Sequence, residues 1–260
     1  MSKPDYTIKS VVKALNILSL FSFESPTLFP RQISQKLSLP MSTVHRLIKT
    51  LETLGLLEQE LLTGRYRIGL KAFELGSLYL HQTSLRAEAF PLLQDLASKT
   101  NETVHLSVLD EGEIIFIEKI DSSHGMGMLS RVGRRAPAHA TASGKVLLAY
   151  LPEKEREIFL SRKELKRCTE RTVTDGQRLR TELSKVTAQG YSLDDEENEQ
   201  SIRCVAAPIW DHSGTVVASV SVSGPVQRMS RGRMVRNLVS QVKETAERVS
   251  QRLGYRKTFH

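Results

Sequence analysis

Residues 29–55 have the sequence FPRQISQKLSLPMSTVHRLIKTLETLG, which predicts two helices separated by a short turn. Pro30 suits the opening turn of the first helix, and Pro40 interrupts it because a proline disfavours helical geometry in the residue before it. Apolar residues one turn apart predict a second helix over 41–54 with one buried face, and Gly55 can end it in a left-handed conformation. The apolar positions are Val44, Leu47, Ile48, Leu51 and Leu54.

The opposite face of the second helix is polar and basic, and a small hairpin follows it. Residues 56–58 and 65–68 are strand-like with a turn at 62–64, a pattern typical of a winged helix-turn-helix. Short hydroxyls and cations at a helix start reach phosphates and base edges in a major groove. A helical hairpin with a solvated basic face is the alternative, and the wing favours DNA binding over it. The candidate DNA contacts are Ser42, Thr43, His45, Arg46, Lys49, Arg65 and Arg67.

The composition fits a two-domain protein with a polyanionic partner. The chain has 260 residues and a net charge of +8, and residues 1–84 hold 10 Lys and Arg against 6 Asp and Glu. Cys168 and Cys204 are too few for a disulfide framework. The polar N-terminus and the lack of an apolar run of ~20 residues predict a cytoplasmic protein without a membrane segment.

The periodicity of the remaining sequence predicts a helical N-terminal part and, from about residue 101, a mixed α and β part. A helix over 8–21 is expected to pack beneath the two helices through Ile8, Val11, Val12, Leu15 and Leu18. Further helices are expected at 70–81, 84–98, 140–151, from Pro152, up to Gly190 and at 230–253, with strands at 104–109, 114–120, 126–130, 204–210 and 215–221.

Motifs along nearly the whole chain resemble those of the isocitrate lyase regulator (IclR) family of transcriptional regulators. Each is weak alone, and their order makes them specific. Within the family, residues 130–135 and 169–174 resemble the regulators of 2-keto-3-deoxygluconate and pectin catabolism. The motifs are LPMSTVHRL (39–47), GRYRIG (64–69), GRR (133–135) continuing to HATASGK (139–145), DDEENE (194–199), RCVAAP (203–208) and SVSGP (221–225).

The resemblance implies an α+β multidomain protein. It comprises a winged helix-turn-helix domain at 1–69, a linker helix at 70–84 and an effector-binding domain resembling GAF and PAS folds at 85–260. Family members are homodimers or homotetramers that bind double-stranded operator DNA and respond to small organic acids or aromatic compounds. The family's ligand positions correspond here to Ala142, Ser143, Asp194, Cys204, Ser221 and Ser223.

The chemistry of these ligand positions is reasonable independently of the resemblance. A helix start at Ala142 offers backbone N–H groups to a carboxylate. Ser221 and Ser223 share one face of a strand, Asp194 can accept from ligand hydroxyls, and Cys204 can shape the wall. The simpler interpretations are a solvated loop or helix cap at Asp194, plain strand serines and a core cysteine. The family often has glycine where Ala142 or Ser143 stands, so an anion may be approached differently.

No catalytic residue, cofactor or metal site is expected. Gly144-Lys145 lacks phosphate-loop spacing, Ser143-Gly144 lacks the first glycine of a nucleophile elbow, and no zinc-ligand spacing occurs, although scattered ligands can converge in space. The sequence favours a ligand-responsive repressor of a carboxylate or sugar-acid catabolic operon. The alternatives are an enzyme acting on a small organic acid with a DNA-docking module, and a nucleoid-type DNA binder without an effector. Four C-terminal arginines are expected on a solvated helix face rather than on DNA: Arg228, Arg231, Arg233 and Arg236.

Overall fold

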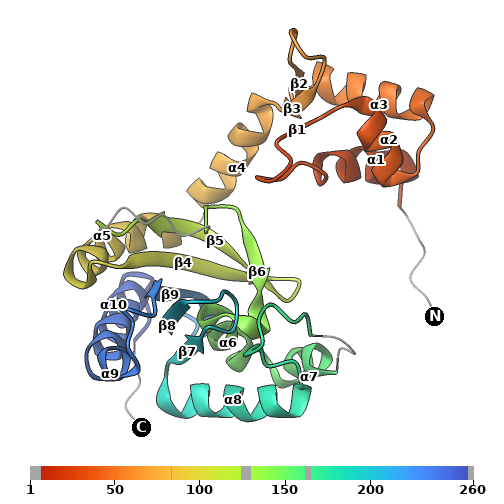
Figure 1. Ribbon diagram of the computed structural model, residues 1–260. Coiled ribbons are helices and arrows are strands. Elements are labelled where there is room, and N and C mark those ends of the chain that lie inside the picture. Colours follow the sequence, from red (N-terminus) through yellow and green to blue (C-terminus); the bar gives the residue numbers. More distant parts are fainter. Residues whose placement is uncertain (1–6, 83, 124–129, 162–164, 257–260) are drawn as a thin grey trace. The chain divides into compact units, whose positions relative to one another are not determined.

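The computed structural model describes residues 7–82, 84–123, 130–161 and 165–256 (Figure 1). The chain divides into two compact units, Met1–Gln82 and Thr83–His260. The first is helical with a small sheet, and the second is built on a larger antiparallel sheet covered by helices. This is the α+β arrangement with an N-terminal winged helix-turn-helix that the sequence predicts.

The first unit contains the two helices and the wing expected from residues 29–68. Ile33 of α2 and Val44, Ile48 and Leu51 of α3 are buried together with Ile17 of α1. The hairpin gains a third strand, β1, which pairs with β3 and was not predicted because a strand of two residues has no period to detect. The helices are α1 (Lys9–Leu18), α2 (Pro30–Leu37), α3 (Met41–Thr53) and α4 (Leu70–Gln82), and the strands are β1 (Thr27–Leu28), β2 (Leu57–Gln59) and β3 (Tyr66–Ile68).

Two glycines fix the beginning of α4 against the end of α3. Gly55 ends α3 with a φ of 72°, a conformation that favours glycine. A side chain at Gly69 would place its Cβ 2.2 Å from the carbonyl oxygen of Gly55. The Lys71 amide also donates to that carbonyl oxygen at 3.2 Å. The first turn of α4 is therefore part of the rigid N-terminal unit.

The predicted inward face of α1 is wrong at four of its five positions, and only Leu18 packs against the core. The buried residue of this helix is Ile17, with Leu18 partly buried beside it. The helix carries a second apolar stripe, and periodicity alone does not distinguish the two. Leu54, which directly follows α3, is also exposed rather than buried, because it lies beyond the last helical turn. The exposed positions predicted to be buried on α1 are Ile8, Val11, Val12 and Leu15.

The second unit has one six-stranded sheet in the order β6-β5-β4-β9-β8-β7, with every neighbouring pair antiparallel. Its strands are β4 (Thr103–Asp110), β5 (Glu113–Ile120), β6 (Arg135–Pro137), β7 (Ser192–Asp195), β8 (Ile202–Trp210) and β9 (Val216–Pro225). Its helices are α5 (Ser84–Thr100), the short η1 (Ala138–Ala140), α6 (Ala142–Ala149), α7 (Glu153–Leu160), α8 (Gly176–Gln189), α9 (Arg231–Arg233), a π-turn at Met234–Leu238 and α10 (Val239–Arg252).

The two faces of this sheet have different chemistry because side chains alternate along a strand. One face is apolar and packs on α5 and α10, through residues such as Leu106, Val220 and Val222. The other face carries His105, Ser221 and other polar residues, and α6 packs against it (Figure 1). The face covered by α6 is therefore the side of the sheet whose side chains suit a polar ligand.

Several predicted elements need correction. β6 and β7 were missed, since β6 has only three residues and β7 lies in an acidic motif. Of the four C-terminal arginines, Arg231 and Arg236 are exposed as expected, whereas Arg228 and Arg233 are not on a solvated face. Arg228 and Arg233 both donate to the buried Glu102, at 2.8 and 2.9 Å. Arg231 pairs with Asp195, and Arg236 donates to a backbone carbonyl oxygen. Most of the strand expected at 126–130 lies outside the described residues.

Candidate functional sites

The polar face of α3 is exposed as the sequence predicts. Ser42, His45, Arg46 and Lys49 are exposed and Thr43 is partly exposed. The Lys49 ammonium group pairs with Glu52 at 2.7 Å, and the hydrogen bond to this carboxylate raises the Lys49 pKa. A DNA phosphate would have to compete with Glu52 for this ammonium group. The face offers hydroxyls, an imidazole and cations along one side of a single helix.

Both wing arginines are exposed and already have partners on the unit itself. Arg67 donates to Glu58 directly across the hairpin at 3.0 Å. The Arg65 guanidinium lies 4.7 Å from the centre of the Phe29 ring and donates to Thr27 at 3.2 Å. These contacts hold the arginine side chains along the hairpin, which reduces the entropy they would lose on binding a phosphate.

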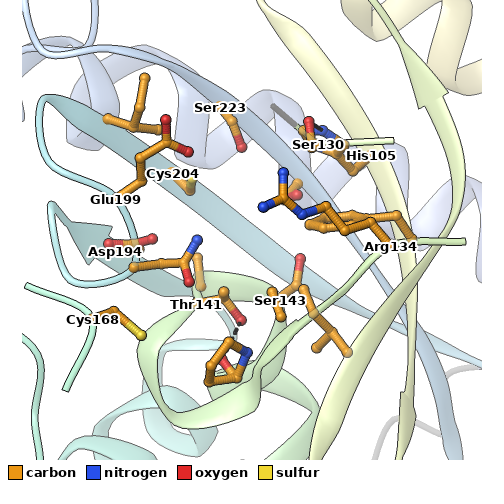
Figure 2. Close-up of a pocket in the computed structure, with 18 of the residues that line it drawn as sticks. His105, Ser130, Arg134, Thr141, Ser143, Cys168, Asp194, Glu199, Cys204 and Ser223 are labelled. Atoms are coloured by element: carbon orange, nitrogen blue, oxygen red, sulfur yellow. Dashed lines mark hydrogen bonds between the residues drawn. The ribbon is translucent and has the colours of Figure 1, made fainter. Parts of the chain in front are cut away.

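A cavity of about 430 Å³ lies in the second unit, between the polar face of the sheet and the start of α6 (Figure 2). Every ligand position implied by the family resemblance lines it. They come from α6, β7, β8 and β9, which are distant in sequence and meet here through the sheet order. Cys204, for example, pairs with both Asp194 and Ser223 across neighbouring strands. The residues are Ala142, Ser143, Asp194, Cys204, Ser221 and Ser223.

The N-terminus of α6 is capped and has the features of an anion-binding helix end. Thr141 caps the helix by accepting from the Gly144 amide at 3.0 Å. A Cβ at Gly144 would lie 2.2 Å from the Ala138 carbonyl oxygen, so glycine allows α6 to begin this close to the preceding turn. The first amides of a helix have no acceptor within the helix, and Ala142 and Ser143, the first two residues of α6, line the cavity.

Asp194 is a buried carboxyl group in an unusual environment. Only 2% of the residue is exposed, and this burial raises its pKa to about 7, against the opposing effect of Lys145. Its Oδ1 accepts from the Glu197 amide at 2.7 Å. Lys145 is also buried and pairs with Glu197 at 2.6 Å. The acidic motif is therefore neither a solvated loop nor a helix cap, and Asp194 can exchange a proton near neutral pH.

Sequence reasoning missed another group of cavity residues. His105 is buried, its Nε2 lies 2.8 Å from the Ser130 hydroxyl, and burial lowers its pKa to about 3, so the ring is neutral. Its Nδ1 has no hydrogen-bond partner among the described residues. Figure 2 shows Arg134 extending into the cavity. Arg134 lies in a quoted motif, but nothing in that motif indicates its direction.

The surroundings of the two cysteines do not activate their thiols. Burial raises the pKa of Cys204 well above its usual range, and nearby Asp194 raises it further. Burial also raises the pKa of Cys168, which lines the same cavity. A thiol with a raised pKa is a poor nucleophile. Within the described ranges, no three His, Cys, Asp or Glu side chains are grouped to hold a metal ion.

Comparison with known proteins gives two matching family models. One, the IclR helix-turn-helix domain, matches residues 10–61, and the other, the C-terminal domain of bacterial IclR transcriptional regulators, matches residues 77–251. The transcriptional regulator KdgR of Escherichia coli (strain K12) is 39% identical over 97% of this chain and 95% of its own length.

Solved structures agree with the family models. The IclR of Thermotoga maritima is 35% identical with a TM-score of 0.75, covering 96% of this chain and 100% of that one. An IclR homologue from Microbacterium hydrocarbonoxydans, complexed with 4-hydroxybenzoate, is 29% identical with a TM-score of 0.82, covering 94% and 98%.

The fold and these similarities define a DNA-binding transcriptional regulator with an effector domain, not an enzyme. The chain belongs to the IclR family, and its similarity to KdgR supports the subfamily resemblance seen in the sequence. None of the described helices is both long and apolar enough to cross a membrane.

Proposed function

We propose that the chain represses a sugar-acid catabolic operon and releases its operator when a small hydroxylated acid binds the cavity. The observation that carries this proposal is the polar lining of the cavity, in which hydroxyls and a guanidinium surround a capped helix start. A carboxylate would accept from the amides at Ala142 and Ser143 and from Arg134. Ligand hydroxyls would meet Ser221, Ser223 and Asp194.

The effector that this lining fits best is a keto sugar acid such as 2-keto-3-deoxygluconate. Its hydroxyls need several partners, and the wall offers Ser130, Asn198 and the β9 serines beyond the carboxylate end. A buried donor or acceptor left without a partner costs about 1–3 kcal/mol, so an acid without hydroxyls would bind less well. An aromatic acid is the second candidate, because Phe116 lines the cavity and the Microbacterium relative holds 4-hydroxybenzoate.

The same proposal assigns the DNA contacts. The exposed face of α3 enters the major groove, and the wing arginines contact the phosphate backbone. The proposed groove contacts are Ser42, Thr43, His45, Arg46 and Lys49, and the proposed backbone contacts are Arg65 and Arg67.

We also propose that a second copy of the chain covers apolar surface on the N-terminal unit, giving a homodimer or homotetramer. The exposed side chains on α4 are Leu70, Phe73, Leu75 and Leu78, and those on α1 are Ile8, Val11, Val12 and Leu15. Because α4 begins fixed to α3, movement of this helix would change the spacing of two DNA-reading units. Such coupling is typically worth about 1–3 kcal/mol, roughly 5–150-fold in operator affinity.

The test is isothermal titration calorimetry of the purified chain with 2-keto-3-deoxygluconate, 4-hydroxybenzoate and gluconate. Tight binding of the keto sugar acid alone, and release of promoter DNA at the same concentration, would support the proposal. Asp194→Ala should retain DNA binding and lose the response, whereas Glu244→Ala, an exposed carboxylate on α10, should retain both. Preference for 4-hydroxybenzoate would replace the sugar-acid assignment with the aromatic one.

A further inference from the structure

The tip of the wing is apolar, although most exposed side chains on α3 and β3 are polar or basic. Leu61 is 97% exposed and Leu62 is 101% exposed, the most exposed of the large apolar side chains among the described residues. Each leucine presents its whole side chain to solvent. Single exposed leucines are ordinary, but two at the end of a projecting hairpin form an apolar tip that an interaction can use.

The wing tip is a tightly built turn. The Glu60 amide donates to the Arg65 carbonyl oxygen at 2.8 Å, and the Gly64 amide donates back to the Glu60 carbonyl oxygen at 2.8 Å. The Thr63 hydroxyl donates to the Glu60 carboxylate at 2.8 Å. Gly64 has a φ of 71°, which closes the turn. The leucines are thus presented on a preorganised backbone, and a partner would not have to order the loop.

The wing tip continues the surface that reads DNA. The exposed face of α3 adjoins the wing hairpin, because the Lys49 side chain lies close enough to Tyr66 of β3 to interact with it. Arg65 and Arg67 stand on the same strand, just behind the leucines. The placement of the duplex rests on the DNA contacts proposed above: with α3 in the major groove and these cations on the phosphate backbone, the wing tip would face the neighbouring minor groove.

We propose that Leu61 and Leu62 enter the minor groove of the operator as an apolar wedge. Leucine is one of the side chains that proteins insert at minor-groove base steps, where they unstack the bases and kink the duplex. A leucine side chain has no hydrogen-bond donor or acceptor to read a base pair. Its selectivity would come from how easily the duplex deforms at a given base step. The wedge selects a flexible pyrimidine–purine step flanking the sequence that α3 contacts.

The test uses the full-length chain and a duplex selected by it from a random-sequence library. Affinity is measured by fluorescence anisotropy at several KCl concentrations for the wild type, Leu61→Ser/Leu62→Ser and Leu61→Met/Leu62→Met. The serine variant should bind at least about tenfold more weakly, because buried leucine surface is lost. Its salt dependence should be unchanged, because no phosphate contact is removed. The methionine variant should bind like the wild type.

Two controls separate the wedge from other roles. Arg67→Ala should weaken binding and also reduce the salt dependence. Ile158→Ser removes an exposed apolar side chain from α7 and should leave DNA affinity unchanged. Replacing the flanking pyrimidine–purine step by a stiff A-tract should weaken the wild type but not the serine variant.

Unchanged affinity of the serine variant would overturn the proposal while leaving the DNA-binding function intact. A change in oligomeric state of that variant without DNA, measured by light scattering, would also overturn it, because the leucines would then lie at a contact between copies. A reduced duplex bend with the serine variant, measured by energy transfer between the duplex ends, would support it.

Discussion

Replacing Asp194 with asparagine should make the effector domain more stable at high pH. In the folded state Asp194 has a pKa of about 7, whereas an unfolded aspartate has a pKa of about 3.9. Between these values the folded chain holds one more proton than the unfolded chain, so its stability falls as pH rises. Asparagine is neutral at every pH and its amide oxygen can still accept from the Glu197 amide. It therefore removes this loss.

The magnitude follows from the difference between the folded and unfolded pKa values of Asp194. A difference of one pKa unit corresponds to 1.36 kcal/mol, so the penalty that Asp194 imposes by pH 8 is about 4 kcal/mol, and the share acquired above pH 5 is about 3 kcal/mol. Lys145 and Glu197, the charged groups nearest to it, remain in both proteins.

Urea unfolding followed by Trp210 fluorescence measures this directly, because Trp210 is the chain's one tryptophan and lies on β8 in the effector domain. The stability advantage of Asp194→Asn should grow by about 3 kcal/mol from pH 5 to pH 8. Glu244→Gln, on the exposed side of α10, serves as the surface-carboxylate control. An advantage that is constant with pH would mean that Asp194 is ionised in the folded state, and the reasoning would fail.

Three further predictions concern other residues. Lys145→Met should destabilise the effector domain by about 3 kcal/mol in urea unfolding, because it leaves Glu197 buried without its 2.6 Å partner; Lys145→Met/Glu197→Leu should regain part of this, and equal losses would contradict the pairing. Gly144→Ala should cost at least about 2 kcal/mol, since its Cβ would lie 2.2 Å from the Ala138 carbonyl oxygen, whereas Gly76→Ala, at a helical position of α4, meets no atom within 4 Å; a smaller cost at Gly144 than at Gly76 would refute the packing argument. Arg46→Ala should weaken operator binding in anisotropy titrations and leave calorimetric effector binding intact, and loss of both would make Arg46 a structural residue.

Local sequence rules predicted the helix-turn-helix well, because proline positions and apolar spacing act within a few residues. They failed where the local sequence allows two different buried faces or two different elements. α1 carries two apolar stripes, and only packing against α2 and α3 selects the one containing Ile17. β7 is hidden because two of its four residues belong to an acidic motif, and its strand conformation depends on pairing with β8.

The cavity shows the same limit. The family resemblance supplied its six ligand positions, and the residues themselves supplied only a reasonable chemistry. His105 was missed because its place opposite Ser221 depends on the pairing of β4 with β9, which no short window of sequence contains. Arg134 was missed because its position depends on backbone pairing with Phe116 of β5, whose amide donates to the Arg134 carbonyl oxygen at 3.1 Å, rather than on any periodic pattern.

The alternation of side chains across the effector sheet separates two kinds of evolutionary constraint. On β9, Val220 and Val222 fill the core beneath α10, while Ser221 and Ser223 face the cavity. Given the ligand-binding role proposed for the cavity, a mutation at a serine is expected to change what the domain recognises, while the neighbouring valines continue to hold the fold. The same strand can thus acquire a new chemical preference one residue at a time, without passing through an unfolded ancestor.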